Sequence, residues 1–326
     1  MSNEIRPILF NPRSVGETSF IEGSESVAPI DRKITGVVGQ SPWYNETLHA
    51  TWGQRFIIKK TLHREQTNRQ DLIIFTHEIF GKVLALDGVI QLTTKDEHIY
   101  HEMIAHVPLL AHGNARKVLI IGGGDGGVAR EVLRHKTVKE VILVEIDPSV
   151  INFSKQHLPE VSCGAFENER LKVVIADGAK FVQETKERFD VIIVDSTDPI
   201  GPGEVLFTSE FYGNCAKIFS DNRGILVTQN GVPILQPKEV TDSYRNFGPY
   251  FAVRTFYRAS VPTYVGGAMT LGFATNNPHA RDVSTGELSM RFDQIEGKEK
   301  LGYYTPEMHC AAFALPPNIQ GLMKDE

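Results

Sequence analysis

The sequence predicts an α/β protein in which a small β-rich domain precedes a doubly wound, mostly parallel sheet. Three observations predict this fold. Before residue 113, short apolar runs are separated by turn residues, as is typical of antiparallel strands. After it, apolar runs alternate with segments of helical spacing, which is typical of a parallel sheet covered by helices. The first of these later runs ends in a glycine-rich turn, which indicates a ligand site at one edge of the sheet.

The chain divides into three expected parts. Residues 1–40 are rich in Ser, Gly, Glu and Pro without sustained periodicity, so we predict a poorly ordered extension. An arm that docks on a partner subunit is the alternative. Residues 41–112 form the predicted N-terminal β-strand domain, and residues 113–326 form the α/β domain. In the β-strand domain we expect strands at 54–58, 71–75 and 82–86, a hairpin turn at Asp87-Gly88, and a helix over 96–110.

The α/β domain shows seven apolar runs and five segments of helical spacing. No helical segment separates the last two runs, so we expect them to form an antiparallel hairpin. The expected strands are 117–121, 140–145, 171–175, 190–194, 224–229, 251–257 and 268–274. The expected helices are 127–135, 148–157, 178–187, 208–219 and 237–246.

Composition excludes several classes of protein. Of 326 residues, 41% are apolar and 23% charged, as in a soluble globular protein. The formal charge of −6 leaves no basic surplus for nucleic acid. No apolar run approaches the ~18 residues of a membrane helix, and the N-terminus carries Glu4 without a long apolar segment, so we expect neither a membrane span nor a secretory signal. Three widely spaced cysteines favour free thiols in a reducing cytoplasm.

The turn after the first strand of the α/β domain has the pattern Gly-x-Gly-x-x-Gly, formed by Gly122, Gly124 and Gly127. Between a strand and a helix this pattern indicates nucleotide binding, because glycines allow a tight turn and a close approach to a ligand. Asp125 lies where a dinucleotide would place its pyrophosphate. A carboxylate there argues against a nicotinamide dehydrogenase and favours a cationic ligand.

Acidic residues follow four strands of the predicted sheet. Because ligands bind at the carboxyl ends of such strands, we expect these acids to converge at one edge. Electrostatic repulsion would then be costly unless a positive or hydroxyl-rich ligand lay among them. The acids concerned are Asp125, Glu145, Asp177, Asp195 and Asp198.

Two of these acids are candidates for binding an adenosine. Glu145 ends the second strand and is expected to accept hydrogen bonds from the ribose hydroxyls, whereas Asp147 is better placed to cap the next helix. Asp177, followed by Gly178, either contacts an adenine or caps a helix, and the sequence does not decide between these roles.

Asp195 and Asp198 are the strongest catalytic candidates. They lie three residues apart after a buried strand, and a loop rich in Gly and Pro follows over 199–203. Neighbouring like charges raise the pKa of one carboxylate, which suits a general base. An Asx turn leading into proline is the alternative, but the adjacent glycine turn favours catalysis.

The helix over 96–110 contains His98, His101 and His106. His101 and His106 are five residues apart and lie on different faces of a helix, so we expect no metal site there. Tyr100 and His101 remain candidate site residues because their helix leads into the α/β domain. Tyr264, between the last two strands, either contacts a methylene chain or is a surface residue of a hairpin turn.

Seven blocks of the sequence carry a resemblance to a known family, and the first 40 residues depart from it. The blocks are 70–75, 85–91, 96–103, 122–127, 144–147, 195–203 and 311–316. In this combination, the chain from Trp43 to about Leu322 closely resembles the bacterial spermidine synthases, which are polyamine aminopropyltransferases.

The resemblance implies a Rossmann-like, methyltransferase-type catalytic domain over 113–326 and a homodimer or homotetramer. It also implies decarboxylated S-adenosylmethionine as the aminopropyl donor, putrescine as the acceptor, and no cofactor or metal. The implied donor-binding residues are Gln70 and Glu145 at the ribose, Asp177, Gly178 and Pro202 at the adenine, and Asp125, beside Gly122 and Gly124, at the primary amine. The implied base is Asp195, and the implied substrate channel contains Tyr100, His101, Asp198 and Tyr264.

Several alternatives remain open at this level. An S-adenosylmethionine-dependent methyltransferase acting on a small amine would use the same fold, and so would a non-catalytic binding protein. Cadaverine, agmatine or spermidine would differ from putrescine only in the channel length and end group that they require. The sequence does not choose between a dimer and a tetramer.

Overall fold

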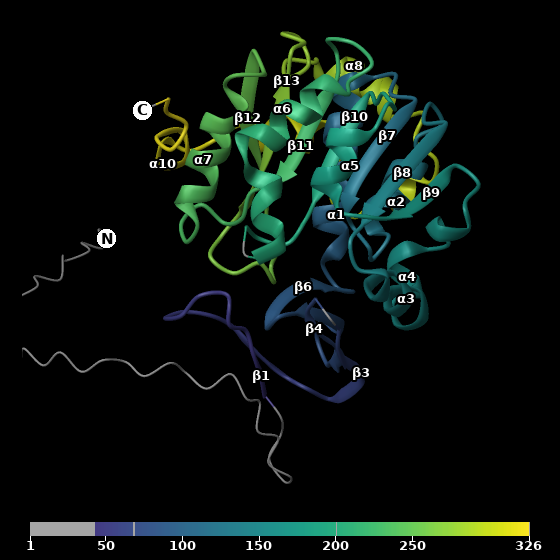
Figure 1. Ribbon diagram of the computed structural model, residues 1–326, viewed down its shortest axis with the longest axis vertical. Coiled ribbons are helices and arrows are strands. Elements are labelled where there is room, and N and C mark those ends of the chain that lie inside the picture. Colours follow the sequence, from purple (N-terminus) through teal and green to yellow (C-terminus); the bar gives the residue numbers. More distant parts are fainter. Residues whose placement is uncertain (1–42, 68, 200, 326) are drawn as a thin grey trace, which may run out of the picture. The chain divides into compact units, whose positions relative to one another are not determined.

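The computed structural model describes residues 43–67, 69–199 and 201–325 (Figure 1). These residues belong to a single compact unit. The predicted extension over 1–40 lies outside the described residues. No described helix combines the length and hydrophobicity needed to cross a lipid bilayer.

The N-terminal part is built from antiparallel strands. A two-stranded ribbon, β1 (Trp43–Asn45) and β2 (Arg55–Ile57), accompanies a four-stranded sheet in the order β3-β4-β5-β6. The sheet strands are β3 (Lys60–Gln66), β4 (Asp71–His77), β5 (Gly81–Leu86) and β6 (Val89–Thr93). The turn predicted at Asp87-Gly88 joins β5 to β6, and both residues have the positive φ that a tight hairpin turn requires.

Alternate side chains of this small sheet point to its two opposite faces, and each face packs against a different part of the chain. Leu72 and Ile74 of β4 pack with apolar side chains of the segment 150–161, which belongs to the α/β domain. Ile73 and Phe75 pack with Tyr44 and Phe56 of the ribbon instead. Strand β3 was not predicted, because it is polar and largely exposed at the edge of the sheet.

The larger sheet has seven strands in the order β12-β13-β11-β10-β7-β8-β9. Five are parallel, and β12 and β13 form the predicted antiparallel hairpin at the β11 edge. All seven predicted strands are confirmed within two residues at each end. The strands are β7 (Lys117–Gly122), β8 (Glu140–Glu145), β9 (Leu171–Ile175), β10 (Val191–Asp195), β11 (Ile225–Gln229), β12 (Val253–Ala259) and β13 (Met269–Thr275).

Helices cover both faces of the sheet. One face packs against α1 (Glu97–His112), α2 (Gly127–Leu133) and α8 (Thr285–Phe292), and the other against α5 (Gly178–Glu184), α6 (Ser209–Lys217) and α7 (Pro237–Phe247). The remaining helices are α3 (Pro148–His157), α4 (Pro159–Ser162), α9 (Pro306–Ala312) and α10 (Pro317–Gln320), with 3₁₀ turns η1 (Ala165–Glu167), η2 (Gly201–Phe207) and η3 (Lys298–Lys300).

Three predicted helices were two or three residues too long at their C-terminal ends, namely α2, α5 and α6, and the last of these ends at Lys217 rather than at residue 219. Helix α2 stops at Leu133 because His135 pairs with Ile295 in an isolated antiparallel bridge. Helix α5 stops at Glu184 because Thr185 is extended.

The chain reverses its direction of travel across the sheet between β7 and β10. From β7 it proceeds to β8 and β9 on one side, and it then returns to β10 and β11 on the other. Ligands of doubly wound sheets bind at the carboxyl ends of the strands at this switch point. The last residues of the two strands, Gly122 and Asp195, are register partners there.

Candidate active site

The glycine turn connects β7 to α2 at the switch point. Three glycines of the turn have positive φ, namely Gly122, Gly123 and Gly126. The turn therefore requires glycine at 123 and 126 as well, although the sequence motif includes only Gly122 of the three. Gly124 and Gly127 serve a different purpose, which is close packing. A Cβ at Gly124 would lie 2.8 Å from Glu145 Oε2, and a Cβ at Gly127 would lie 2.3 Å from the His101 ring.

Asp195 ends β10 beside this turn. Its Oδ1 accepts a hydrogen bond of 2.6 Å from the Tyr100 hydroxyl, and among the described residues its buried Oδ2 has no hydrogen-bond partner. Burial, followed by the nearby charge of Asp125, raises the pKa of Asp195 to about 6. The side chain is therefore a carboxylate that readily accepts a proton near neutral pH.

Asp125 and His101 form a charged pair next to Asp195. Asp125 Oδ1 accepts from the Gly127 backbone N–H at 2.6 Å and lies 3.5 Å from His101 Nε2. Burial alone would raise the pKa of Asp125, but the charge and hydrogen bond of His101 hold it below its usual value. Burial likewise opposes the charge on His101, but Asp125 and Glu97 raise its pKa to about 10. At neutral pH the ring is a cation.

His101, Asp125 and Asp195 each present an atom within 4.8 Å of the other two, which is a spacing that a metal ion could use. A metal would need a lone pair from the His101 ring, whereas both ring nitrogens face carboxylate oxygens of Glu97 and Asp125. Those contacts favour the protonated ring, which has no lone pair to donate.

Glu145 lies at the end of β8, as predicted, and is buried. Burial raises its pKa to about 7, although the Asp147 backbone N–H donates to Glu145 Oε1 at 2.9 Å. Asp147 caps α3 by accepting from the Ser149 N–H, which confirms the prediction from sequence. The Gln70 amide donates to Asp147 Oδ2 at 3.1 Å, so Gln70 and Glu145 both contact Asp147. The structure thus brings together the two residues expected at a ribose.

The structure does not test the predicted contact of Asp177 and Pro202 with an adenine. Asp177 is exposed, and its Oδ1 accepts from the N–H groups of Ala179 and Lys180, so the helix cap considered for it is present. Gly178 is buried against Ile121, where a Cβ would lie 2.4 Å from Cγ2. Pro202 belongs to η2, and its side chain lies outside the described part of the chain. Contact of these residues with an adenine stays a prediction.

A second group of acids lies around Asp198. The Gln229 amide donates to Asp198 Oδ1 at 3.1 Å, and burial raises the pKa of Asp198. Burial and then the charge of Asp198 raise the pKa of Glu239 in α7 to about 8. Burial also raises the pKa of Glu46, with a smaller contribution from Asp198. Glu46 and Glu239 each retain one buried oxygen without a hydrogen-bond partner among the described residues.

Tyr264 is partly buried and packs against the hydrophobic core, rather than lying free at the surface of a turn. Its hydroxyl donates to the Gln91 carbonyl at 2.6 Å, and its ring packs edge-on against Tyr100 with centroids 5.9 Å apart. The neighbouring Thr263 donates from its backbone N–H and its hydroxyl to Asp96 Oδ2. Two residues of the segment 91–96 therefore hold the Tyr264 loop at the site.

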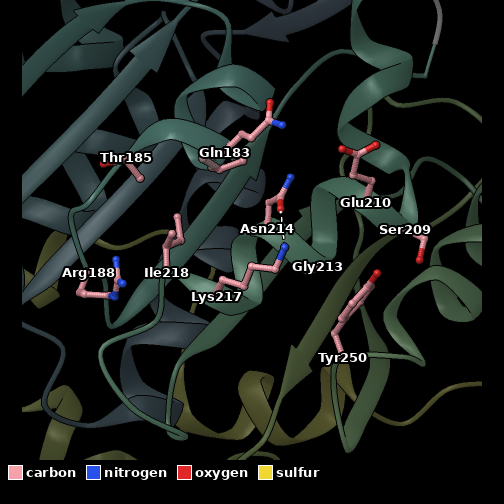
Figure 2. A pocket seen from close by; sticks show the side chains of 11 residues that line it. Gln183, Thr185, Arg188, Ser209, Glu210, Gly213, Asn214, Lys217, Ile218 and Tyr250 are labelled. Atoms are coloured by element: carbon pink, nitrogen blue, oxygen red, sulfur yellow. Dashed lines mark hydrogen bonds between the residues drawn. The ribbon is translucent and has the colours of Figure 1, made fainter.

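A surface hollow of about 660 Å³ lies elsewhere, lined by the end of α5, the following turn and α6 (Figure 2). Its cationic side chains are already engaged, since Arg188 donates to the carbonyls of residues 186 and 187 and Lys217 pairs with Asn214. It includes no predicted site residue.

Comparison with known proteins places this arrangement in a family. A model described as "Spermine/spermidine synthase domain" matches residues 97–284, and one described as "Spermidine synthase tetramerisation domain" matches residues 42–94. The chain belongs to the spermine/spermidine synthase family. The predicted membership is confirmed, and so is the predicted fold class.

Family relatives match over most of the chain. The polyamine aminopropyltransferase of Sodalis glossinidius is 53% identical over 277 residues, which is 85% of this chain and 95% of the relative. That of Pectobacterium carotovorum is 52% identical over 283 residues, covering 87% and 97%. A crystal structure of spermidine synthase with the transition-state analogue AdoDATO superposes with a TM-score of 0.78 at 35% identity, covering 90% of this chain and 98% of that one. Spermidine synthase from Thermotoga maritima gives 0.75 at 33% identity, covering 90% and 97%.

Sequence reasoning about this family member missed four charged residues near the site. Glu97 contacts His101 and is itself paired with Arg130, and the charge of Asp198 acts on Glu46 and Glu239. Only Glu97 had a local signal, since it precedes His101 by one helical turn of four residues. Arg130, Glu46 and Glu239 arrive from segments distant in sequence, so no local pattern marks them.

Proposed function

We propose that this family member is a spermidine synthase, which transfers the aminopropyl group of decarboxylated S-adenosylmethionine to putrescine. The products are spermidine and methylthioadenosine. The observation that carries the proposal is the pair Asp125 and Asp195 at the switch point of the sheet, one held as an anion and the other poised to accept a proton.

Asp125 would select the donor. The aminopropyl arm ends in an ammonium, which a buried anion attracts, whereas the carboxylate of ordinary S-adenosylmethionine would be repelled. Glu145 would accept hydrogen bonds from the ribose hydroxyls. With a pKa of about 7, its carboxylate is ionised above neutral pH, where both oxygens are acceptors only.

Asp195 would act as the general base. An alkyl ammonium has a pKa near ~10.4, so putrescine must lose a proton before it can attack. Asp195 would take that proton, and the amine lone pair would form a bond to the carbon next to the sulfonium sulfur. The carbon–sulfur bond breaks with its electron pair going to sulfur, which leaves as the neutral thioether of methylthioadenosine. This displacement uses no covalent enzyme intermediate and no metal.

The acids around Asp198 would bind the remote ammonium of the acceptor. Asp198, Glu239 and Glu46 form a partly buried acidic group whose elevated pKa values a cation would lower. Tyr100 and Tyr264 supply aromatic surface beside Asp195, against which the methylene chain would pack. This favours a diamine over an acceptor with one amine.

We also propose a cytoplasmic homo-oligomer, either a homodimer or a homotetramer. The match of residues 42–94 to a model described as a tetramerisation domain supports self-association. Light scattering of the purified chain would distinguish the two forms.

The test uses purified protein, putrescine, and either decarboxylated or ordinary S-adenosylmethionine, with products identified by mass spectrometry. We expect spermidine and methylthioadenosine from the decarboxylated donor only. Methylated putrescine from the ordinary donor would identify a methyltransferase, an alternative that the aminopropyltransferase relatives do not favour. No turnover with either donor, despite donor binding, would identify a binding protein.

Two aspartate variants separate the roles at the site. Asp195→Asn should lower kcat by ~10² or more, which is the usual contribution of a positioned base. Asp198→Asn is the matched control, and its main effect should be a higher KM for putrescine. An Asp195→Asn enzyme with an unchanged kcat would remove Asp195 from the mechanism.

A further inference from the structure

The His101 ring lies between two carboxylates. Its Nδ1 is 2.5 Å from Glu97 Oε2, and its Nε2 is 3.5 Å from Asp125 Oδ1. A neutral imidazole has one N–H and can donate to only one of these groups, whereas the protonated ring donates to both. The ring also lies directly against Gly127, which leaves it no room to turn away.

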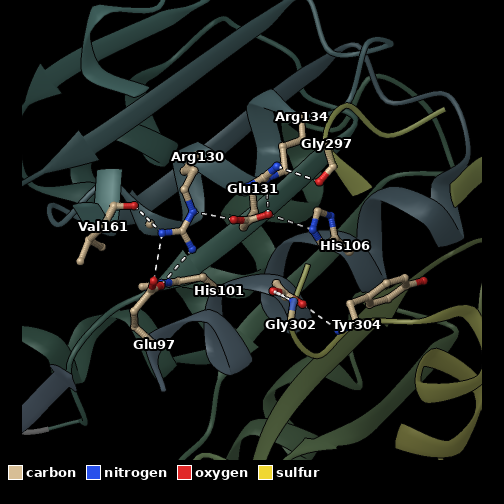
Figure 3. A network of polar contacts seen from close by, with 12 residues as sticks. Glu97, His101, His106, Arg130, Glu131, Arg134, Val161, Gly297, Gly302 and Tyr304 are labelled. Carbon is tan, nitrogen blue, oxygen red and sulfur yellow. Dashed lines mark hydrogen bonds and ion pairs between the residues drawn. The ribbon is translucent and has the colours of Figure 1, made fainter. Parts of the chain in front are cut away.

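Glu97 is fixed in turn by Arg130 (Figure 3). Arg130 donates to both oxygens of Glu97, at 3.0 and 2.9 Å, and continues to Glu131 and to the Val161 carbonyl. A bidentate pair of this kind holds the carboxylate rigidly. Burial opposes the charge on Glu97, but His101 and Arg130 lower its pKa below the usual value, so Glu97 stays an anion.

We propose that Glu97 is a positioning residue that keeps His101 doubly protonated, so that Asp125 remains the anion and Asp195 becomes the proton acceptor. This inference rests on the proposed function, because it assigns the two carboxylates their separate tasks toward the donor and the acceptor.

The physical reason is the closeness of Asp125 and Asp195. Two largely enclosed carboxylates within 4.8 Å resist being ionised together, so one of them binds a proton more tightly. A cation beside Asp125 decides which one. The other groups facing His101 are Tyr100 on its own helix and Asp195 at the end of β10, and Arg130 on α2 acts through Glu97. The pKa directions of Asp125 and Asp195 agree with this assignment.

Glu97→Gln tests the inference. Glutamine can still accept from Nδ1, but it no longer compensates the positive charge, and Arg130 is left next to the ring. His101 then becomes neutral more easily and presents a lone pair to Asp125, so Asp125 rather than Asp195 becomes the carboxylate that binds a proton, and the donor's ammonium loses its anionic partner. We expect decarboxylated S-adenosylmethionine to bind at least tenfold more weakly at pH 8.5, with the loss shrinking toward pH 6.5 as His101 is protonated again.

Methylthioadenosine provides the matched ligand, because it lacks the aminopropyl arm. Its affinity, measured by calorimetry, should change less than twofold in Glu97→Gln, which also shows that the variant is folded. Glu131→Gln is the matched control protein, since Glu131 contacts Arg130 but not His101, and it should leave both affinities within twofold. Equal losses for the two ligands, or a loss independent of pH, would overturn the proposal.

A measurement without any ligand keeps this inference separate from the proposed function. In protein labelled with ¹³C-histidine, the His101 resonance, assigned through His101→Gln, should not titrate between pH 6 and pH 9 in the unsubstituted enzyme and should titrate there in Glu97→Gln. Titration of the unsubstituted His101 in this range would refute the role of Glu97 even if spermidine is made. Failure to make spermidine with the expected titration would refute only the proposed function.

Discussion

Asp195→Asn should stabilise the unliganded protein while it abolishes most activity. The pKa of Asp195 is raised from 3.8 to about 6, so the folded state binds the proton more tightly than the unfolded chain does. The contribution of this group to stability is therefore fully present at low pH and is lost as the pH rises through about 6. Above that pH, the ionised carboxylate destabilises the fold.

The magnitude follows from the shift. At 1.36 kcal/mol per pKa unit, a shift of about two units corresponds to a penalty of about 3 kcal/mol at pH 8. Because the carboxylate is increasingly protonated at lower pH, this penalty falls to about 1.5 kcal/mol at pH 5 and to nearly nothing below pH 4. Asparagine removes the charge, its Oδ1 can still accept from Tyr100, and its N–H₂ group can donate toward Asp125.

The assay is thermal unfolding of both proteins at equal subunit concentration, since an oligomer's Tm depends on concentration. We expect a Tm higher by roughly 5–10 °C at pH 8 and by about half as much at pH 5. Asp282→Asn, at an exposed position, is the matched control and should change stability by less than about 0.5 kcal/mol. A variant that is less stable at pH 8, or equally stabilised at both pH values, would refute the reasoning.

Three further substitutions probe the site. Asp125→Ala should bind ordinary S-adenosylmethionine about tenfold more tightly, because it removes a repulsive carboxylate and frees the His101 cation; calorimetry showing no gain would contradict the selectivity argument. Glu239→Gln should raise the KM for putrescine about tenfold at pH 9 but only slightly at pH 7. The reason is that Glu239, with a pKa of about 8, is mostly neutral at pH 7. An increase in KM that does not depend on pH would be inconsistent with that ionisation. Gly127→Ala should displace the His101 ring and cost about 1–3 kcal/mol of stability. Gly286→Ala is the control, because a Cβ there meets nothing within 4 Å. Equal Tm values for the two variants would show that the His101 ring is not tightly packed.

Local patterns in the sequence predicted the elements of the α/β domain and the edge of the sheet at which the acids gather. Buried parallel strands such as β7 and β10 are continuous apolar runs, and an acid or a glycine follows each run where the chain leaves the core. The same reasoning failed for β3, whose polar residues are paired by β4 rather than by any pattern of their own.

The sequence by itself determined the doubly wound sheet, the glycine turn, and the placement of Asp125, Glu145 and Asp195 at strand ends, because these features depend on residues close together in the chain. Only the tertiary structure decided which acids are charged. The pKa of Asp195 depends on burial and on Asp125, and the charge on His101 depends on Glu97 and Asp125. Charges interact through space and according to their exposure to water, so groups seventy residues apart in the sequence titrate as one cluster.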